Sequence, residues 1–259
     1  MTAIEQRAAE QFRRDTAKHE LTVLHDDGLH RHLRVAEPGS GHLWFELVTW
    51  PGGLTIRGDM GCYIFSCAKD MFDFFRRSAW GGGPNLHYWA QKADAGDIHA
   101  GVREYSADLL RKHIEDDLAA LAEDDLAERL RVRAEKLGTT SDRLPAGAAA
   151  GCRAASAAYM AGLREELDDD LLGELPMWCI DDEGDALAGV RQFDYRPDGE
   201  PPFTFDADEW KVRDWSGPYV WCCHAILFGI GAYDRVKAEQ PVPALSAAAT
   251  ADAEALAHV

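Results

Sequence analysis

Aromatic rings and arginines in the N-terminal part of the sequence are the side chains best suited to binding a small molecule. A tryptophan beside an arginine can stack on a nucleobase while the guanidinium holds a phosphate. The net charge here approaches zero and the rings are dense, which favours a pocket, although most rings in any protein build the core. The candidate ligand-binding residues are Trp50, Arg57, Asp59, Arg77, Tyr88 and Trp89.

Asp59 is the weakest of these candidates. It lies in the sequence Gly-Asp-Met-Gly at 58–61, next to Arg57, where an exposed carboxylate could bind a metal ion or the edge of a base. Asp and Gly are also the ordinary residues of a tight hairpin turn. The turn interpretation is favoured, because a lone carboxylate is weak evidence for a site.

Negative charge is concentrated in the second half of the chain. The sequence has 27 Lys and Arg against 45 Asp and Glu, a formal net charge of −18, whereas residues 1–105 hold 12 basic and 14 acidic residues. A strongly negative surface repels nucleic acid and anionic membranes and attracts basic partners. We therefore expect no direct nucleic-acid or membrane partner and favour a protein partner with a basic surface.

Two acidic clusters lie between residues 165 and 185, a stretch with ten acidic residues and no basic one. Three interpretations stay open: a solvated flank, a docking surface for a basic protein, and an imitation of duplex phosphates that occupies a DNA-binding protein's groove. A calcium loop is disfavoured because the acids lack the spacing of an EF-hand. The candidate partner-binding residues are Asp168, Asp169, Asp170, Asp181, Asp182 and Glu183.

The sequence predicts no metal, cofactor or catalytic site. Cys222, Cys223 and His224 are consecutive in a predicted helix, where neighbouring side chains point about 100° apart and cannot close on one ion. Neither Cys-X-X-Cys nor His-Glu-X-X-His occurs. The glycine-rich stretches 81–83 and 229–231 lack the lysine of a P-loop and the setting of a dinucleotide fingerprint. A protein that is not an enzyme is favoured.

The elements that would position these residues form an α+β fold. Short stretches rich in β-branched and aromatic residues, separated by turns too short for a crossover helix, predict an antiparallel meander of four to five strands over 20–66. The strand at 42–50 is apolar on both faces, which predicts a central position. The expected strands are 21–25, 29–36, 42–50, 54–57 and 63–66.

Helical periodicity appears on both sides of the meander. Apolar residues at every third or fourth position predict a long helix over 106–137, which pairs with a second one at 146–172 in an acidic hairpin. The helix at 218–237 is apolar on nearly every face and must pack in the core. Further helices are expected at 4–18, 68–77 and 85–92.

The C-terminal helix is too apolar to stand alone, which favours one domain over 1–240 followed by a flexible tail at 241–259. The longest apolar run, 219–233, is shorter than the about 20 residues that cross a bilayer. The N-terminal residues lack the apolar segment of a secretory signal. We expect a cytoplasmic protein with reduced cysteines.

Five sequence motifs lie in the N-terminal part and in the C-terminal helix. They are FELVTWPG at 45–52, GDMGCYIFS at 58–66, DMFDFFR at 70–76, NLHYWAQKADAGD at 85–97 and YVWCCHAILFGIGAYD at 219–234. Together they resemble a family of uncharacterised proteins encoded by bacteriophages and prophages. The resemblance spans most of the chain and is weakest from about 123 to 200 and in the tail. It implies an accessory protein of the host bacterial cytoplasm and no particular reaction.

Two functions follow as expectations. The first is a phage or prophage accessory protein that binds a host protein through its acidic half. The alternative is a nucleotide-binding protein that sequesters its ligand, or a nucleotide-handling enzyme, with a pocket made of the aromatic and arginine residues named above.

Overall fold

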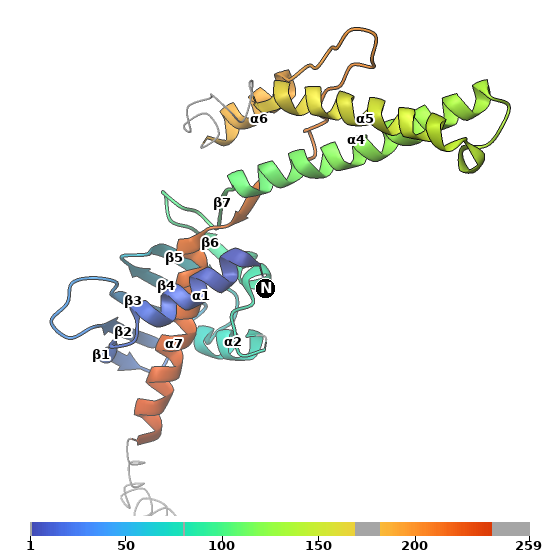
Figure 1. Cartoon of the computed structure of the whole chain (residues 1–259). Helices are drawn as coiled ribbons and strands as arrows, with labels where there is room; N and C mark the ends of the chain where they lie inside the picture. The colour runs from blue at the N-terminus through green and yellow to red at the C-terminus, as the bar shows by residue number, and fades with distance from the viewer. Residues whose placement is uncertain (1, 80, 169–181, 240–259) are drawn as a thin grey trace, which may run out of the picture. The chain divides into compact units, whose positions relative to one another are not determined.

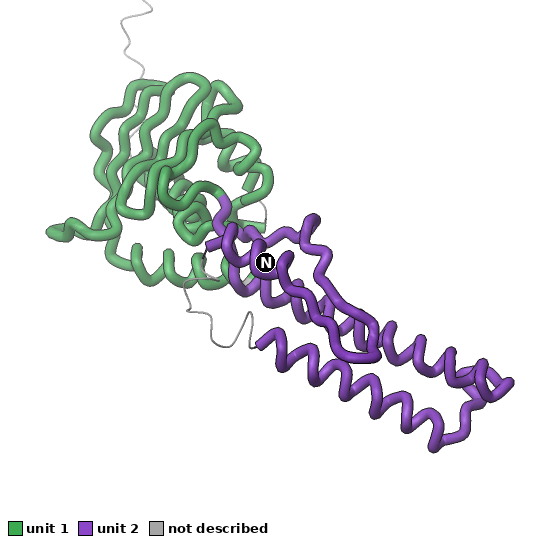
Figure 2. Tube along the Cα trace, turned by 90° about the horizontal axis from the view of Figure 1, so that it is seen from above, with its two compact units in different colours: residues 1–102, 215–259 green, residues 103–214 purple. Residues whose placement is uncertain are grey.

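The computed structural model describes residues 2–79, 81–168 and 182–239 (Figure 1). The chain forms two compact units, shown in Figure 2: unit 1 contains residues 1–102 and 215–259, and unit 2 contains residues 103–214. Each unit has its own cluster of buried hydrophobic side chains. The fold is α+β, as predicted.

Unit 1 is built on a six-stranded antiparallel sheet whose strands follow one another in sequence order. The first five strands confirm the predicted meander. Two-residue turns join β1 to β2, β3 to β4 and β4 to β5, and residues 37–44 connect β2 to β3. Gly28 at φ 61° and Gly61 at φ 114° occupy positions that disfavour other residues. The strands are β1 (Glu20–Asp27), β2 (His30–Ala36), β3 (Phe45–Trp50), β4 (Gly53–Gly58), β5 (Gly61–Ser66) and β6 (Ala93–Ala95).

The sixth strand is an addition to the predicted sheet. It follows the short helix α3 (Leu86–Ala90) and pairs with Ile64 and Phe65 of β5. Its three residues, Ala-Asp-Ala, have no alternating apolar pattern and therefore give no strand signal in the sequence.

Helices cover one face of the sheet (Figure 1). α7 (Gly217–Glu239) comes so close to β3 that an added Cβ at Gly229 would lie 2.7 Å from the Leu47 side chain. α1 (Ala3–Asp15) packs beside α7, and the rings of Phe12 and Trp221 meet edge to face with centroids 5.1 Å apart. The predicted core position of the C-terminal helix is confirmed.

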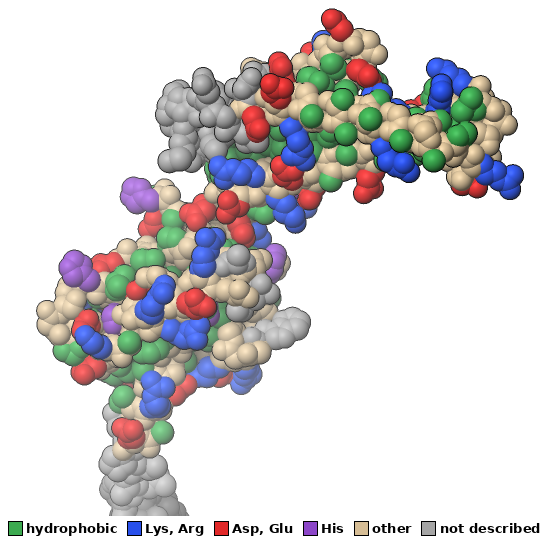
Figure 3. Space-filling model, in the orientation of Figure 1, with side chains coloured by type: hydrophobic (Ala, Val, Ile, Leu, Met, Phe, Trp, Pro, Cys, Tyr) green, Lys and Arg blue, Asp and Glu red, His purple; other side chains and the backbone are tan. Residues whose placement is uncertain are grey.

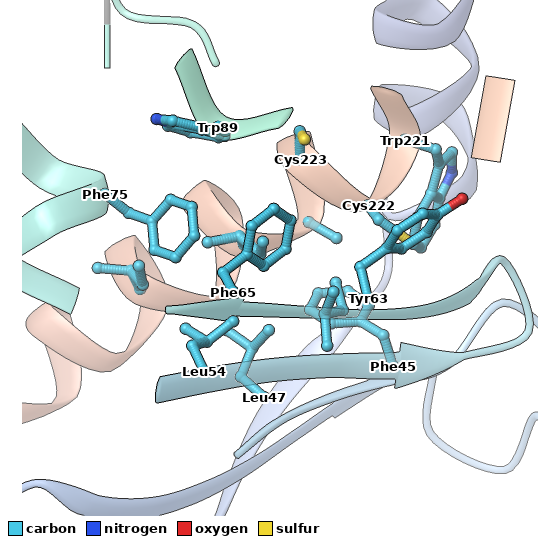
Figure 4. Close-up of a cluster of buried hydrophobic side chains, with 14 of the residues drawn as sticks. Phe45, Leu47, Leu54, Tyr63, Phe65, Phe75, Trp89, Trp221, Cys222 and Cys223 are labelled. Carbon is cyan, nitrogen blue, oxygen red and sulfur yellow. The ribbon is translucent and has the colours of Figure 1, made fainter. Parts of the chain in front are cut away.

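Large rings fill the space between this sheet and its helices (Figure 4). Phe65 of β5 meets Phe75 of α2 (Met71–Ser78) edge to face at 5.4 Å, and Phe75 meets Trp89 of α3 at 4.7 Å. Such pairs add about 0.5–1.5 kcal/mol to the free energy gained from burial. Cys222 and Cys223 of α7 are buried in the same core.

The other unit contains an antiparallel helical hairpin, as predicted. α4 (Ala107–Lys136) begins where the Ser106 hydroxyl accepts a hydrogen bond from the backbone N–H of Leu109, and α5 (Ala146–Leu167) follows the short 3₁₀ turn η1 (Ser141–Arg143). The predicted end of α5 at 169–172 and the predicted tail at 241–259 lie outside the described residues.

The two halves of the hairpin are packed differently. In the half remote from η1, side chains of α4 such as Ile114 and Leu118 share a core with Tyr159 and Leu163 of α5. α6 (Glu183–Gln192) and the segment before β8 (Arg213–Trp215) complete that core, and β8 pairs with β7 (Arg103–Tyr105). Within 126–155, only Ala134 is buried.

α6 was not expected from the sequence. The acidic stretch at 181–185 reads as a solvated flank, but Asp182 is the N-cap of this helix, and its carboxylate accepts hydrogen bonds from the backbone N–H groups of Gly184 and Asp185. Asp residues are favoured at such positions, so this signal was present in the sequence.

The sequence favours one domain because the C-terminal helix needs the N-terminal sheet, and that packing is observed within unit 1. Residues 103–214 nevertheless bury their own apolar side chains against each other and form the second unit. The physical reason is the second hydrophobic cluster, which periodicity alone could not assign to a separate core.

Candidate binding surfaces

A groove beside α2 brings two of the predicted ligand-binding residues together. Its volume is about 820 Å³, and it contains Arg77 of α2 and Tyr88 of α3. The Tyr88 side chain is partly exposed, and the Nζ atom of Lys92 lies 5.4 Å from the centre of its ring. The groove, here called the α2 groove, is lined by Leu29, Ala68, Lys69, Asp70, Asp73, Phe74, Arg77, Ser78 and Tyr88.

The charges of the α2 groove are balanced. Arg77 forms an ion pair with Asp73, with a nitrogen–oxygen distance of 2.8 Å, and Asp70 accepts two hydrogen bonds from Arg31 at 3.0 Å. Lys69 is the remaining cation on the lining. An anionic ligand would therefore meet two carboxylates as well as two cations here.

Trp89 does not contribute to that groove. Its side chain is fully buried, and its Nε1 donates a hydrogen bond to the Ser78 hydroxyl at 2.8 Å. The prediction that Trp89 binds a ligand is wrong, because a ring enclosed by Phe75 and the rest of the core has no face to offer a ligand.

Trp50 and Asp59 also have structural roles. The Trp50 ring lies over the backbone of Gly53, where an added Cβ would lie 2.1 Å from a ring carbon. The Asp59 carboxylate accepts a hydrogen bond from the backbone N–H of Leu43 at 2.5 Å, and Leu43 has the unusual φ of 57°. Asp59 thus stabilises a strained loop position, in agreement with the favoured turn interpretation.

Arg57 belongs to a charged row on the sheet face opposite the buried side chains of β3. Register places Arg34, Glu46 and Arg57 side by side on β2, β3 and β4. Arg34 donates a hydrogen bond to Glu46 at 2.7 Å. The guanidinium groups of Arg34 and Arg57 lie over the Trp44 ring, 4.5 and 5.2 Å from its centre. The strand pattern alone did not reveal this row, because it depends on the register of three strands.

The Glu46 carboxylate is almost fully enclosed by this row. Burial acts to raise its pKa, but the hydrogen bond from Arg34 and the nearby His32 and Arg57 hold the pKa below its ordinary value. An ionised, neutralised carboxylate at this position stabilises the sheet. The row has two guanidinium groups for this one carboxylate, so a positive charge is in excess.

The predicted partner-binding residues have three different fates. Asp168 is exposed at the C-cap of α5. Asp182 caps α6, and Glu183 forms an ion pair with Arg213 at 2.6 Å, so both serve the fold. Asp169, Asp170 and Asp181 lie outside the described residues.

A different acidic surface is present on α4. Asp116 and Glu123 are seven residues apart, and so are Asp117 and Asp124. Seven residues make about two helical turns, so the four residues form two adjacent pairs, one two turns beyond the other, on the same side of α4. Among the described residues, none of the four forms an ion pair with Lys or Arg. We call these four residues the α4 acidic face. Their spacing was readable from the sequence, but their lack of basic partners was not.

Asp117 is the partly buried member of this face. Burial, together with the negative charges of Asp116 and Asp206, raises the pKa of Asp117, and the nearby His113 only partly opposes this effect. The imidazole of His113 itself stacks on Trp210 with ring centres 5.2 Å apart. Burial is the largest of these contributions, and the opposing effect of His113 exceeds that of either aspartate.

The charge division between the units is as uneven as the sequence suggests. Residues 103–214 contain 14 basic and 28 acidic residues, whereas the remainder of the chain contains 13 and 17. Arginine pairs neutralise part of the acidic excess, for example Arg164 with Glu115 and Arg191 with Asp208. Figure 3 shows acidic and basic side chains on both units.

Cys222 and Cys223 of α7 belong to the core, and His224 lies at its edge, where its ring stacks on Phe12. Burial raises the pKa of the Cys222 and Cys223 thiols, and it lowers the pKa of His224. Within the described ranges, no group of three or more His, Cys, Asp or Glu side chains is arranged to hold a metal ion.

No protein-family model, curated protein or solved structure matches this chain. In the part of the chain that the structure describes, none of the helices combines the length and the apolar character required to cross a membrane. The fold and surfaces therefore define an α+β protein of two units, one nearly balanced in charge and one strongly acidic.

Proposed function

We propose that this protein is a phage or prophage accessory protein that acts in the bacterial cytoplasm by binding a basic surface of a host protein, and that it is not an enzyme. The α4 acidic face is the docking surface. The observation that supports this assignment is the position of these four carboxylates on one helix, where no Lys or Arg of the described residues forms an ion pair with them. A basic partner would supply the cations that they lack.

The energetics favour a fast and salt-sensitive interaction. A single exposed ion pair contributes about 0–1 kcal/mol, so four such pairs give useful affinity only together. Complementary charge also accelerates encounter, and both effects weaken as salt shortens the Debye length from about 10 Å at 0.1 M to about 3 Å at 1 M.

The test compares two variants with the same change of net charge. The full chain is immobilised, and capture of proteins from bacterial lysate is quantified at several salt concentrations. One variant neutralises the α4 acidic face, and its control neutralises four exposed carboxylates of unit 1. The first is Asp116→Asn, Asp117→Asn, Glu123→Gln and Asp124→Asn; the second is Glu10→Gln, Glu20→Gln, Asp27→Asn and Asp94→Asn.

We expect wild-type protein and the unit 1 control to capture the same basic partner, and the α4 variant to lose it. Capture should fall steeply with added salt. Equal loss in both variants would mean that only overall charge matters, and unchanged capture by the α4 variant would remove the proposal.

The second candidate function, nucleotide binding, is supported by one observation: the α2 groove places Tyr88 and Arg77 on one lining. A nucleotide that stacks on Tyr88 should raise the melting temperature, because a ligand that binds only the native state stabilises it. Tyr88→Ala and Arg77→Ala should each abolish the shift caused by ATP or GTP. No shift with either nucleotide at millimolar concentration would reject this function.

A further inference from the structure

A second groove lies between the two long helices of unit 2, in the half of the hairpin near η1. Its volume is about 460 Å³. Val132 of α4 and Ala148, Gly151 and Cys152 of α5 form its apolar floor. An added Cβ at Gly151 would meet no atom within 4 Å, so the floor is open at this position. We call this cavity the hairpin groove.

The chain itself places a carboxylate at one end of the hairpin groove. Glu200 and Pro201 line that end. The Glu200 carboxylate accepts hydrogen bonds from two nitrogens of Arg129, the shorter at 2.5 Å, and the Tyr159 hydroxyl donates to the backbone carbonyl of Pro201 at 3.2 Å. An acidic loop residue bound to an arginine of α4 is thus already part of this groove.

Further along α4, the rim of the groove has two cations without an ion pair among the described residues. Arg133 and Lys136 are exposed and line the groove, and within the described ranges neither forms an ion pair. By contrast, Arg131 on the same helix is held by Glu128 and Glu135. The free rim cations continue the row that begins at Arg129.

The unpaired charges of the groove lining are positive. The lining contains three cations and three carboxylates, but Asp125 and Glu200 are paired with Arg129, and Glu128 is paired with Arg131. Figure 3 shows Lys and Arg side chains gathered at the η1 end of the hairpin. A partner that is attracted here must therefore be negatively charged.

We propose that the hairpin groove binds an acidic peptide segment of a partner protein. Apolar side chains of the segment would contact the floor around Val132 and Gly151, and its carboxylates would pair with Arg133 and Lys136, as Glu200 pairs with Arg129. This surface is separate from the α4 acidic face and has the opposite charge preference, so it does not depend on the proposed function.

The test measures the fluorescence anisotropy of a labelled peptide with a repeated Glu-Leu-Glu-Ala sequence, added to the full chain in 0.15 M salt. At this ionic strength the Debye length is about 8 Å, so the remote acidic half of the unit is screened. The reference peptide has Gln in place of every Glu. We expect the Glu peptide to bind at least tenfold more tightly than the Gln peptide.

Two pairs of variants separate the groove from its surroundings. Arg133→Glu with Lys136→Glu should weaken binding at least tenfold, whereas Arg143→Glu with Arg153→Glu, which makes the same charge change outside the groove lining, should leave most of it. Gly151→Leu fills the floor and should also abolish binding, whereas Ala154→Leu on an exposed position of α5 should not. Circular dichroism verifies that all four variants keep their helices.

Three results would overturn the proposal. The first is equal affinity for the Glu and Gln peptides, and the second is equal weakening by a groove variant and its control. The third is a wild-type dimer, seen by light scattering, that Gly151→Leu converts to a monomer; the groove would then hold a second copy of this chain.

Discussion

Unit 1 and unit 2 differ in how some of their charged side chains are used. In unit 1, charged groups are paired close to the core: Arg31 with Asp70, and Asp26 with Lys237 and the Tyr233 hydroxyl. In unit 2, several carboxylates of α4 have no basic partner among the described residues, and two rim cations are also unpaired. Charges that are already satisfied stabilise a fold, whereas charges that are left unsatisfied are available to a partner.

The two units also differ in how extensively their apolar side chains are buried. The core of unit 1 contains rings from four helices and the sheet, whereas Ala134 is the one buried residue in the half of the hairpin near η1. Unit 1 should therefore carry most of the stability, and unit 2 most of the binding.

The largest expected effect is the loss of a core ring in unit 1. Trp221 meets Phe12 and Phe45 edge to face, and its Nε1 donates to Asp15 at 3.0 Å. Trp221→Ala should lower the free energy of unfolding by about 3–5 kcal/mol. Hydrogen exchange should accelerate across the sheet and remain slow in the buried part of α4 and α5.

Leu163→Ala in the core of unit 2 is the matched variant, with an expected cost of about 2–5 kcal/mol. Its effect should be confined to unit 2. Faster exchange in both units from either substitution would show that the two units unfold together.

An intermediate effect is expected at the start of α2. Asp70 is the N-cap of this helix and the partner of Arg31, whose side chain is 10% exposed and also lies over the Phe72 ring at 4.7 Å. Asp70→Ala removes the cap and leaves the guanidinium without its partner, so it should cost about 2–4 kcal/mol. Urea denaturation at pH 7 measures the loss; a cost below 0.5 kcal/mol would contradict the pairing.

The dependence of this effect on pH follows from the sign of the pKa shift. Burial acts to raise the pKa of Asp70, but the Arg31 guanidinium and the amide of Phe72 outweigh it, so the folded pKa lies below the ordinary 3.8. The stabilisation is therefore complete above pH 3.8 and is lost as the pH falls through the lower folded value. The free energies of unfolding of wild type and Asp70→Ala should therefore become more similar as the pH falls below 3.8.

The smallest expected effect is a gain in stability from the substitution of Asp117. The pKa of Asp117 is raised above 3.8 by burial and by the charges of Asp116 and Asp206. The ionised group therefore costs stability at neutral pH, and Asp117→Asn should stabilise the protein by less than about 0.5 kcal/mol, the usual range for a substitution outside the core. Thermal melts at pH 7 and pH 3 should show a gain at pH 7 that vanishes at pH 3.

Residue pattern predicted the parts of the fold that depend on local sequence. Short stretches with alternating apolar residues predicted five strands. A helical segment that is apolar on nearly every side predicted α7, with Cys222 and Cys223 buried. β6 was missed because three residues carry no period, and it forms only because β5 lies beside it.

The candidate surfaces were less predictable because they depend on distant partners. Glu183 looks free in the sequence, but Arg213, 30 residues away, neutralises it. Asp116 and Asp117 look like part of a solvated helix, and only the structure shows that no Lys or Arg of the described residues forms an ion pair with them. Composition gave the correct region of negative charge and not the residues that expose it.

Carboxyl footprinting tests the central claim most directly. The protein is treated with a carbodiimide and an amine, free and bound to the partner captured from lysate, and the labelling of each carboxylate is measured by mass spectrometry. We expect labelling to fall at Asp116, Asp117, Glu123 and Asp124 and to stay unchanged at Glu10, Glu20, Asp27 and Asp94. Protection of the unit 1 residues, with the α4 acidic face labelled as in the free protein, would contradict the account.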